Sequence, residues 1–134
     1  MLLGRKEIGS SSLKRKTPHV QHTVMRNEVF LWLQPEQWRE EFTLKWDDNT
    51  IITDALFKLD GKYGFLEIDI TQSMAQNEKK INMYKRLRVS GRWQAKNGPF
   101  PEVLYVTISE YRKEKLSKML GDLQGRVVTV NDIK

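Results

Sequence analysis

Three acidic residues lie in two segments that otherwise have the composition of buried strands. Glu67 and Asp69 stand within Phe65 to Ile70, and because they are two residues apart on a strand, their side chains point to the same face. Asp54 stands in the preceding segment, Ile51 to Leu59. Carboxylates inside an apolar strand cost free energy unless they are paired or bind a metal. Three of them on adjacent strands are hard oxygen ligands, so we expect them to bind Mg²⁺ or Mn²⁺.

A lysine is expected beside these acids. On the helix predicted over residues 73–90, at 100° per residue, Lys80 falls inside an apolar stripe. The stripe consists of Met74, Ile81, Tyr84 and Leu87. A lysine there can stabilise the negative charge that gathers on a phosphate during cleavage. The predicted catalytic residues are therefore Asp54, Glu67, Asp69 and Lys80. Two alternatives stay open: the acids pair with basic residues on a solvated face, and Lys80 extends to solvent from the edge of the stripe.

A basic run follows the acids. Seven lysines and arginines and no acid lie between Lys79 and Pro101, and Trp93 lies among them. Basic residues interleaved with an aromatic one are typical of a phosphate-binding surface. The predicted nucleic-acid contacts are Lys79, Lys85, Arg86, Arg88, Arg92, Trp93 and Lys96. A solvated helix face is the alternative interpretation.

The overall composition favours a polyanionic partner. The chain of 134 residues has a net charge of +6 and a pI of about 9.6, and each cation placed on a phosphate releases counterions. It has no cysteine, which removes disulfides, thiolate catalysis and cysteine-ligated zinc and fits a cytoplasmic protein. No apolar run approaches the ~18 residues of a membrane helix. His19 and His22 lack a third zinc ligand nearby in sequence.

Residues 1–17 are predicted to form a flexible basic tail or linker, and residues 18–134 one domain. Hydrophobic periodicity, turn residues and caps predict its elements. Helices are expected over 18–33, 73–90 and 110–120, and strands over 41–46, 51–59, 63–70, 103–108 and 126–130. The order is α-β-β-β-α-β-α-β, and the first three strands read as an antiparallel meander.

This order of elements resembles the PD-(D/E)XK nucleases, an α/β fold with a mixed sheet flanked by helices, as in restriction endonucleases. That resemblance implies one acid on the second strand and an acid pair, or an acid and a lysine, on the third. Here Asp69 stands where the usual motif has lysine, and Lys80 would supply the cation from the next helix. Lys80 and Tyr84 also resemble, with Lys for Gln, the Gln-x-x-x-Tyr element of RecB-like members.

Between about Pro18 and Arg112 the sequence resembles the replication-relaxation family. The residues that carry the resemblance are Pro18-His19-Val20, Asn27-Glu28-Val29, Thr53-Asp54-Ala55, Phe65 to Asp69 with Thr71, Lys80 with Tyr84, and Val103 to Thr107. Such proteins are similar to a winged helix followed by a nuclease-like domain. Thr53 stands where the motif has proline, and the winged helix is missing, so DNA binding by that part is not implied.

The resemblance implies a DNA-associated accessory protein of plasmid or mobile-element replication, or of DNA relaxation. A Mg²⁺-dependent endonuclease or nickase is the second hypothesis. The third is a non-catalytic interaction domain that uses Trp32, Trp38 or Trp93. The expected partners are DNA, replication or mobilisation proteins and a second copy of the chain, with no membrane, and the expected location is the cytoplasm.

Overall fold

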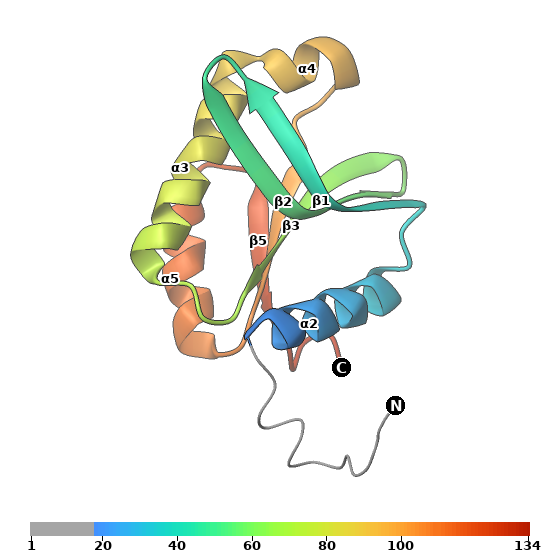
Figure 1. Ribbon diagram of the computed structural model, residues 1–134, viewed down its shortest axis with the longest axis vertical. Helices are drawn as coiled ribbons and strands as arrows, with labels where there is room; N and C mark the ends of the chain where they lie inside the picture. The colour runs from blue at the N-terminus through green and yellow to red at the C-terminus, as the bar shows by residue number, and fades with distance from the viewer. Residues whose placement is uncertain (1–17) are drawn as a thin grey trace.

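A five-stranded sheet forms the centre of the domain, with helices on both faces. The computed structural model describes residues 18–134, so the predicted tail over 1–17 lies outside the described residues. Helix α2 (Pro18–Leu33) covers one face of the sheet, and α3 (Met74–Ser90) and α5 (Glu110–Leu120) lie side by side on the other (Figure 1). The predicted α/β class with a mixed sheet between helices is confirmed.

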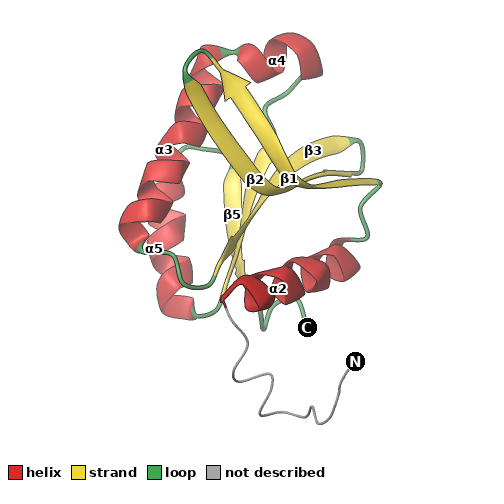
Figure 2. Ribbon diagram, viewed as in Figure 1, coloured by secondary structure: helices red, strands yellow, loops and turns green. Residues whose placement is uncertain are grey.

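The strands follow one another across the sheet in sequence order. They are β1 (Gln37–Trp46), β2 (Asn49–Leu59), β3 (Lys62–Asp69), β4 (Glu102–Thr107) and β5 (Gly125–Thr129). Strands β1 to β3 form the expected antiparallel meander. Strands β4 and β5 add in parallel after the crossover helices α3 and α5 (Figure 2). The sheet therefore has two edges, β1 and β5, and β3 at its centre.

Local signals explain where the long helices begin and end. Ser73 caps α3 in a capping box with Gln76, and Gly91 ends the helix in the left-handed region at φ 72°. Ser109 caps α5 by accepting a hydrogen bond from the Arg112 amide. Within residues 18–134, no helix is both long and apolar enough to cross a membrane.

A short helix, α4 (Arg92–Asn97), occupies a segment that the sequence pattern did not predict as helical. Tertiary contacts of Trp93 explain why this segment is helical. Trp93 is buried, stacks edge-on against Phe65 and Tyr63, and donates its indole hydrogen to the Pro99 carbonyl. The ring of Trp93 is therefore engaged in the core, and its contact with nucleic acid or a partner protein stays a prediction.

Two hydrophobic cores lie on opposite faces of the sheet, and the β1–β2 hairpin contributes to both. On a regular strand Trp38 and Phe42 would share a face. Yet Trp38 packs into the core under α2 and Phe42 into the core under α3. The same switch separates Ala55 from Ile51 on β2. Between the members of the first pair lies Glu41, at φ 51°. At Glu41 and the facing Asp54, both strands of the hairpin skip one step of the alternation. The side chains that point into a core therefore change from the core under α2 to the core under α3.

Replacing Gly64 by alanine should destabilise the domain by about 1–3 kcal/mol, the usual cost of overpacking. Gly64 of β3 pairs with Phe57 of β2, and a Cβ at Gly64 would lie 2.2 Å from Phe57 Cζ. Urea denaturation followed by circular dichroism measures the change. In a Phe57→Leu background the ring is gone, so Gly64→Ala should cost less; an equal cost in both backgrounds would contradict the packing explanation.

Candidate functional site

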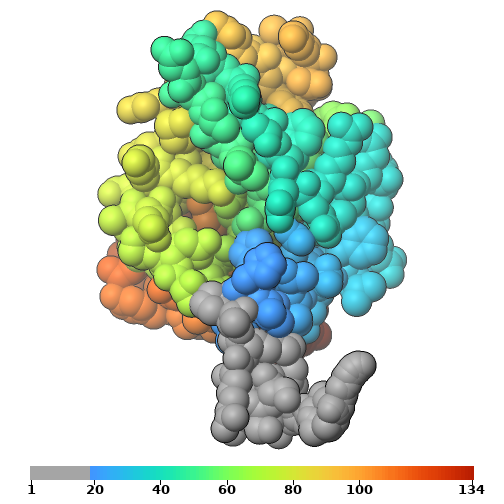
Figure 3. All heavy atoms as spheres, in the orientation of Figure 1, coloured from blue at the N-terminus to red at the C-terminus, as the bar shows by residue number. Residues whose placement is uncertain are grey.

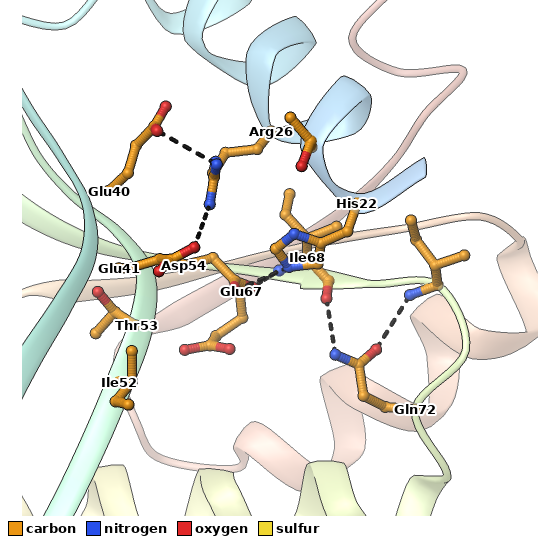
Figure 4. A network of polar contacts seen from close by, with 12 residues as sticks. His22, Arg26, Glu40, Glu41, Ile52, Thr53, Asp54, Glu67, Ile68 and Gln72 are labelled. Atoms are coloured by element: carbon orange, nitrogen blue, oxygen red, sulfur yellow. Dashed lines mark hydrogen bonds and ion pairs between the residues drawn. The ribbon is translucent and has the colours of Figure 1, made fainter. Parts of the chain in front are cut away.

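The pairing between β2 and β3 stops where the acids begin. The ladder ends at Ala55 opposite Leu66. Beyond it, the Asp54 carboxylate takes over the role of a backbone partner, since Oδ2 accepts a hydrogen bond of 2.6 Å from the Ile68 amide. Asp54 Oδ1 lies 2.9 Å from His22 Nε2 of α2 (Figure 4). Asp54 therefore closes the gap that opens between the two strands.

Glu67 is buried on the face of β3 that α3 covers. Its Oε1 lies 2.8 Å from Lys80 Nζ, and its Oε2 accepts a hydrogen bond from the Tyr84 hydroxyl. Lys80 also donates a hydrogen bond of 2.8 Å to the Ile52 carbonyl of β2. The side chain of Lys80 is 33% exposed against 3% for Glu67, so the lysine reaches from the surface to the acid. The expectation that Lys80 points toward the carboxylate strand is confirmed; its catalytic role stays a prediction.

Opposing effects set the ionisation state of the Glu67 carboxyl. Burial raises the pKa of its carboxyl to about 7, against an ordinary value of 4.5. The positive charge of Lys80 opposes that rise, and the negative charge of Asp54 adds to it. Burial and the neighbouring Glu67 also raise the pKa of Tyr84, which keeps its hydroxyl protonated as a donor. Near neutral pH, Glu67 can therefore hold either a proton or a cation.

Asp69 belongs to a different network. It is fully buried and accepts two hydrogen bonds from Arg112 of α5, of 2.7 and 2.8 Å. Thr107 and the Asn77 amide donate two more, of 2.7 and 3.0 Å. Although burial pushes the other way, these bonds, that of Arg112 foremost, hold the pKa of Asp69 below its ordinary value. The carboxylate ties β3 to both helices of its face.

Helix α2 contributes two side chains that the sequence interpretation missed. His22 reaches Asp54, and burial is outweighed by that hydrogen bond, which raises the pKa of the imidazole. Arg26 lies 3.2 Å from Glu40 and 3.6 Å from Glu41, at the point where β1 changes face. Figure 4 shows both side chains pointing from α2 toward the strands. Their spacing of four residues on one helix was the available signal.

The three predicted acids do not form one cluster. Within residues 18–134, no three acidic or histidine side chains are close enough together to hold a metal ion. Asp54 and Glu67 interact, whereas Asp69 is saturated by its own partners. Beside them lies Tyr105, whose buried hydroxyl has no hydrogen-bond partner in the described part of the chain. Binding of Mg²⁺ or Mn²⁺ by Asp54 and Glu67 therefore stays a prediction.

We call the group of Asp54, Glu67 and Lys80 the acidic pocket, and two of its three side chains reach the surface. In the space-filling view the surface is recessed between α3 and the β1–β2 hairpin, above α2 (Figure 3). The side chains of Asp54 and Lys80 are part-exposed, at 16% and 33%. Both polar groups are therefore reachable from solvent, while Glu67 lies beneath them.

Several side chains of the basic run have partners within the domain. Arg88 pairs with Asp122 at 3.5 Å, and Arg92 with Asp47 at 2.5 Å. Lys85 donates to the Met119 carbonyl at 2.9 Å. The remaining predicted contacts are exposed side chains without a carboxylate partner among residues 18–134. They are Lys79, Arg86 and Lys96.

Comparison with known proteins gives a family and a fold. The profile of replication-relaxation proteins matches residues 1–103. No curated protein matches the chain. Among solved structures, the small subunit of the heterodimeric restriction endonuclease R.BspD6I superimposes with a TM-score of 0.55 at 14% identity, covering 90% of this chain and 67% of that subunit. At this identity the likeness concerns the fold, and it supports the PD-(D/E)XK nuclease-like arrangement expected from the sequence.

The stability of the domain should fall as pH rises from about 4.5 to about 7, because Glu67 keeps its proton in the folded state after the unfolded chain has lost it. Each pKa unit is worth about 1.4 kcal/mol, so Glu67 accounts for a loss of about 3 kcal/mol, constant above pH 7. Glu67→Gln should abolish this part of the decline. Urea denaturation from pH 4 to pH 8 measures it.

The matched control is Glu78→Gln, which removes an exposed carboxylate from α3, the helix that covers Glu67, and should leave the pH profile as in the wild type. In all three proteins His22 also lowers the stability as pH rises, because the pKa of its imidazole is raised in the folded state. An unchanged profile in Glu67→Gln would show that the burial of Glu67 does not govern its titration.

Proposed function

Since the chain belongs to the replication-relaxation family and has a restriction-endonuclease-like fold, we propose that it is a DNA-associated accessory protein in the replication of a plasmid or other mobile element. Membership of the family supports the role in replication. The fold supports a part in DNA chemistry or DNA recognition. The proposal concerns the described domain, because the DNA contact is assigned to residues within it.

The observation that carries the DNA contact is the surplus of basic side chains without an acidic partner. Lys79 and Arg86 on α3 and Lys96 on α4 are exposed, and none has a carboxylate within 4 Å among residues 18–134. With a net charge of +6, such side chains gain more from a phosphate backbone than from solvent, because binding releases condensed counterions. Contacts of this kind read no sequence, so the expected binding is sequence-independent.

Binding to duplex DNA should weaken steeply with salt. If five side chains contact phosphates, log Kd against log salt concentration should change with a slope of magnitude roughly 4.5. Fluorescence anisotropy with two 30-bp duplexes of unrelated sequence, in 50 to 300 mM KCl, measures the slope. Equal affinity for the two duplexes is expected. Binding that does not respond to salt, or no binding at 50 mM, would refute the proposed DNA contact.

A second candidate function, that of a metal-dependent endonuclease or nickase, is favoured by the pairing of Lys80 with Glu67 beside Asp54. Asp54 and Glu67 would hold a divalent cation, which would polarise a phosphate and activate water there. Lys80 would offer its charge to the phosphate. His22 orients the Asp54 carboxylate, and Tyr84 orients that of Glu67. Asp69, predicted as the third ligand, is committed to Arg112.

If this second function holds, the protein nicks supercoiled plasmid in the presence of Mn²⁺. Glu67→Gln should abolish nicking and leave DNA binding intact or tighter, because one negative charge near the phosphate is lost. Lys80→Ala should also abolish nicking. Lys79→Ala, an exposed neighbour on the same helix, is the matched control and should retain most of the activity.

Gel analysis of the nicked circle, with calorimetry of Mn²⁺ binding, tests the candidate. Folded wild type that neither nicks DNA nor binds Mn²⁺ would leave a non-catalytic DNA-associated domain. Equal losses in the Lys79 and Lys80 variants would contradict the specific role of Lys80.

A protein partner is part of the proposal as well. The structural neighbour is a subunit of a heterodimeric endonuclease. On this chain, Leu31 and Trp32 of α2 are exposed at 69% and 36%. They lie at a hollow of about 300 Å³ that Ile133 also lines. These apolar side chains support a contact with a replication or mobilisation protein, or with a second copy of the chain.

A further inference from the structure

A basic groove runs along the edge strand β1. One part, of about 290 Å³, is lined by Lys45 of β1 and by Arg92 and Lys96 of α4. A second part, of about 260 Å³, is lined by Arg39. The two parts share Phe42, Trp93 and Asn97 in their lining, so they lie next to each other, and we treat them as one groove.

All charged residues that line the groove are basic. Its two parts contain four cations and no acidic residue. Arg39, Lys45 and Lys96 have no carboxylate partner within residues 18–134. Arg92 pairs with Asp47, but both side chains are more than half exposed, at 57% and 60%. Such an exposed ion pair contributes little to stability, so a phosphate can replace Asp47 as the partner of Arg92.

The cations stand on rigid supports. Trp93 fastens α4 to the core through its ring contacts with Phe65 and Tyr63. On β1, Phe42 and Leu44 pack into the core under α3, and this fixes the strand that carries Arg39. Figure 1 shows α4 beside the free end of the β1–β2 hairpin. Because neither element is a free loop, the groove keeps its charges in place before a ligand arrives, and binding costs less entropy.

The groove also adjoins the acidic pocket. Thr43, which lines the groove, is paired with Ile52 of β2. The carbonyl of Ile52 accepts the hydrogen bond from Lys80. Adjacent strands lie about 4.8 Å apart, so one strand spacing separates the backbone of the groove from the backbone that holds Lys80. A nucleic-acid strand that passes Lys80 can therefore continue into the groove.

We propose that the groove between β1 and α4 binds phosphodiester groups of DNA next to the position served by Lys80. Arg39, Arg92 and Lys96 are the contacts, and the apolar floor of Phe42 and Trp93 excludes water from beneath them. This inference rests on the proposed DNA association, which it makes specific. Single-stranded and duplex DNA offer the same phosphodiester chemistry, and the test distinguishes them.

The test compares Arg39→Ala/Lys96→Ala with Lys115→Ala/Lys118→Ala. Both double variants remove two exposed basic side chains, but the second pair lies on α5, which does not line the groove. Each phosphate contact contributes about 0.9 to the salt slope on duplex DNA and about 0.7 on single strands. The groove variant should therefore lower the slope by roughly 1.8 on duplex or roughly 1.4 on a 30-nucleotide single strand. The control pair should keep the wild-type slope.

A third variant moves the affinity the other way. Asp47→Asn releases Arg92 from its ion pair, so it should tighten binding severalfold at 50 mM KCl. Circular dichroism melts verify that all variants fold. The form of DNA whose slope changes identifies the ligand.

Three outcomes decide the matter. Wild type that binds no DNA refutes the proposed DNA association and the groove together. Wild type that binds with the expected salt slope, but whose groove and control variants lose equally, overturns the groove alone and leaves the association standing. Loss confined to the groove variant, with tighter binding by Asp47→Asn, supports the inference.

Discussion

The ion pair between Lys80 and Glu67 holds together the part of the domain that could do chemistry. Lys80 connects α3 to the buried acid on β3 and, through the Ile52 carbonyl, to β2. These contacts cross the gap where the β2–β3 ladder has ended. An unpaired carboxylate at this depth would take up a proton. The positive charge of Lys80 opposes that uptake, so Glu67 loses its proton near pH 7 although it is buried.

The two carboxylates of β3 show how environment separates side chains of the same type. Glu67 and Asp69 point to the same face, yet Glu67 has one cation and one hydroxyl, whereas Asp69 has four donated hydrogen bonds. Their pKa values accordingly move in opposite directions. Opposed shifts on neighbouring acids distinguish a group that can exchange its partner from one that fixes the fold.

Much of this arrangement was accessible from local sequence signals. The caps at Ser73 and Ser109 and the alternation of the strands depend on near neighbours, and these elements form as predicted. The inward position of Lys80 follows from helical periodicity. The partnership of Asp69 with Arg112 joins residues 43 apart, and α4 forms because Trp93 finds a place in the core. Such contacts depend on the finished topology, so periodicity could not supply them.

The left-handed backbone of Glu41 has a consequence for how the protein behaves in a crowded solution. β1 is an edge strand, and its open backbone groups could template pairing with another chain. A residue at φ 51° in mid-strand bends that edge, and the charged side chains Arg39, Glu40 and Glu41 lie exposed beside the bend. A flat, uncharged partner strand cannot follow such an edge. The distortion that carries β1 from one core to the other therefore also protects the sheet against growth into aggregates.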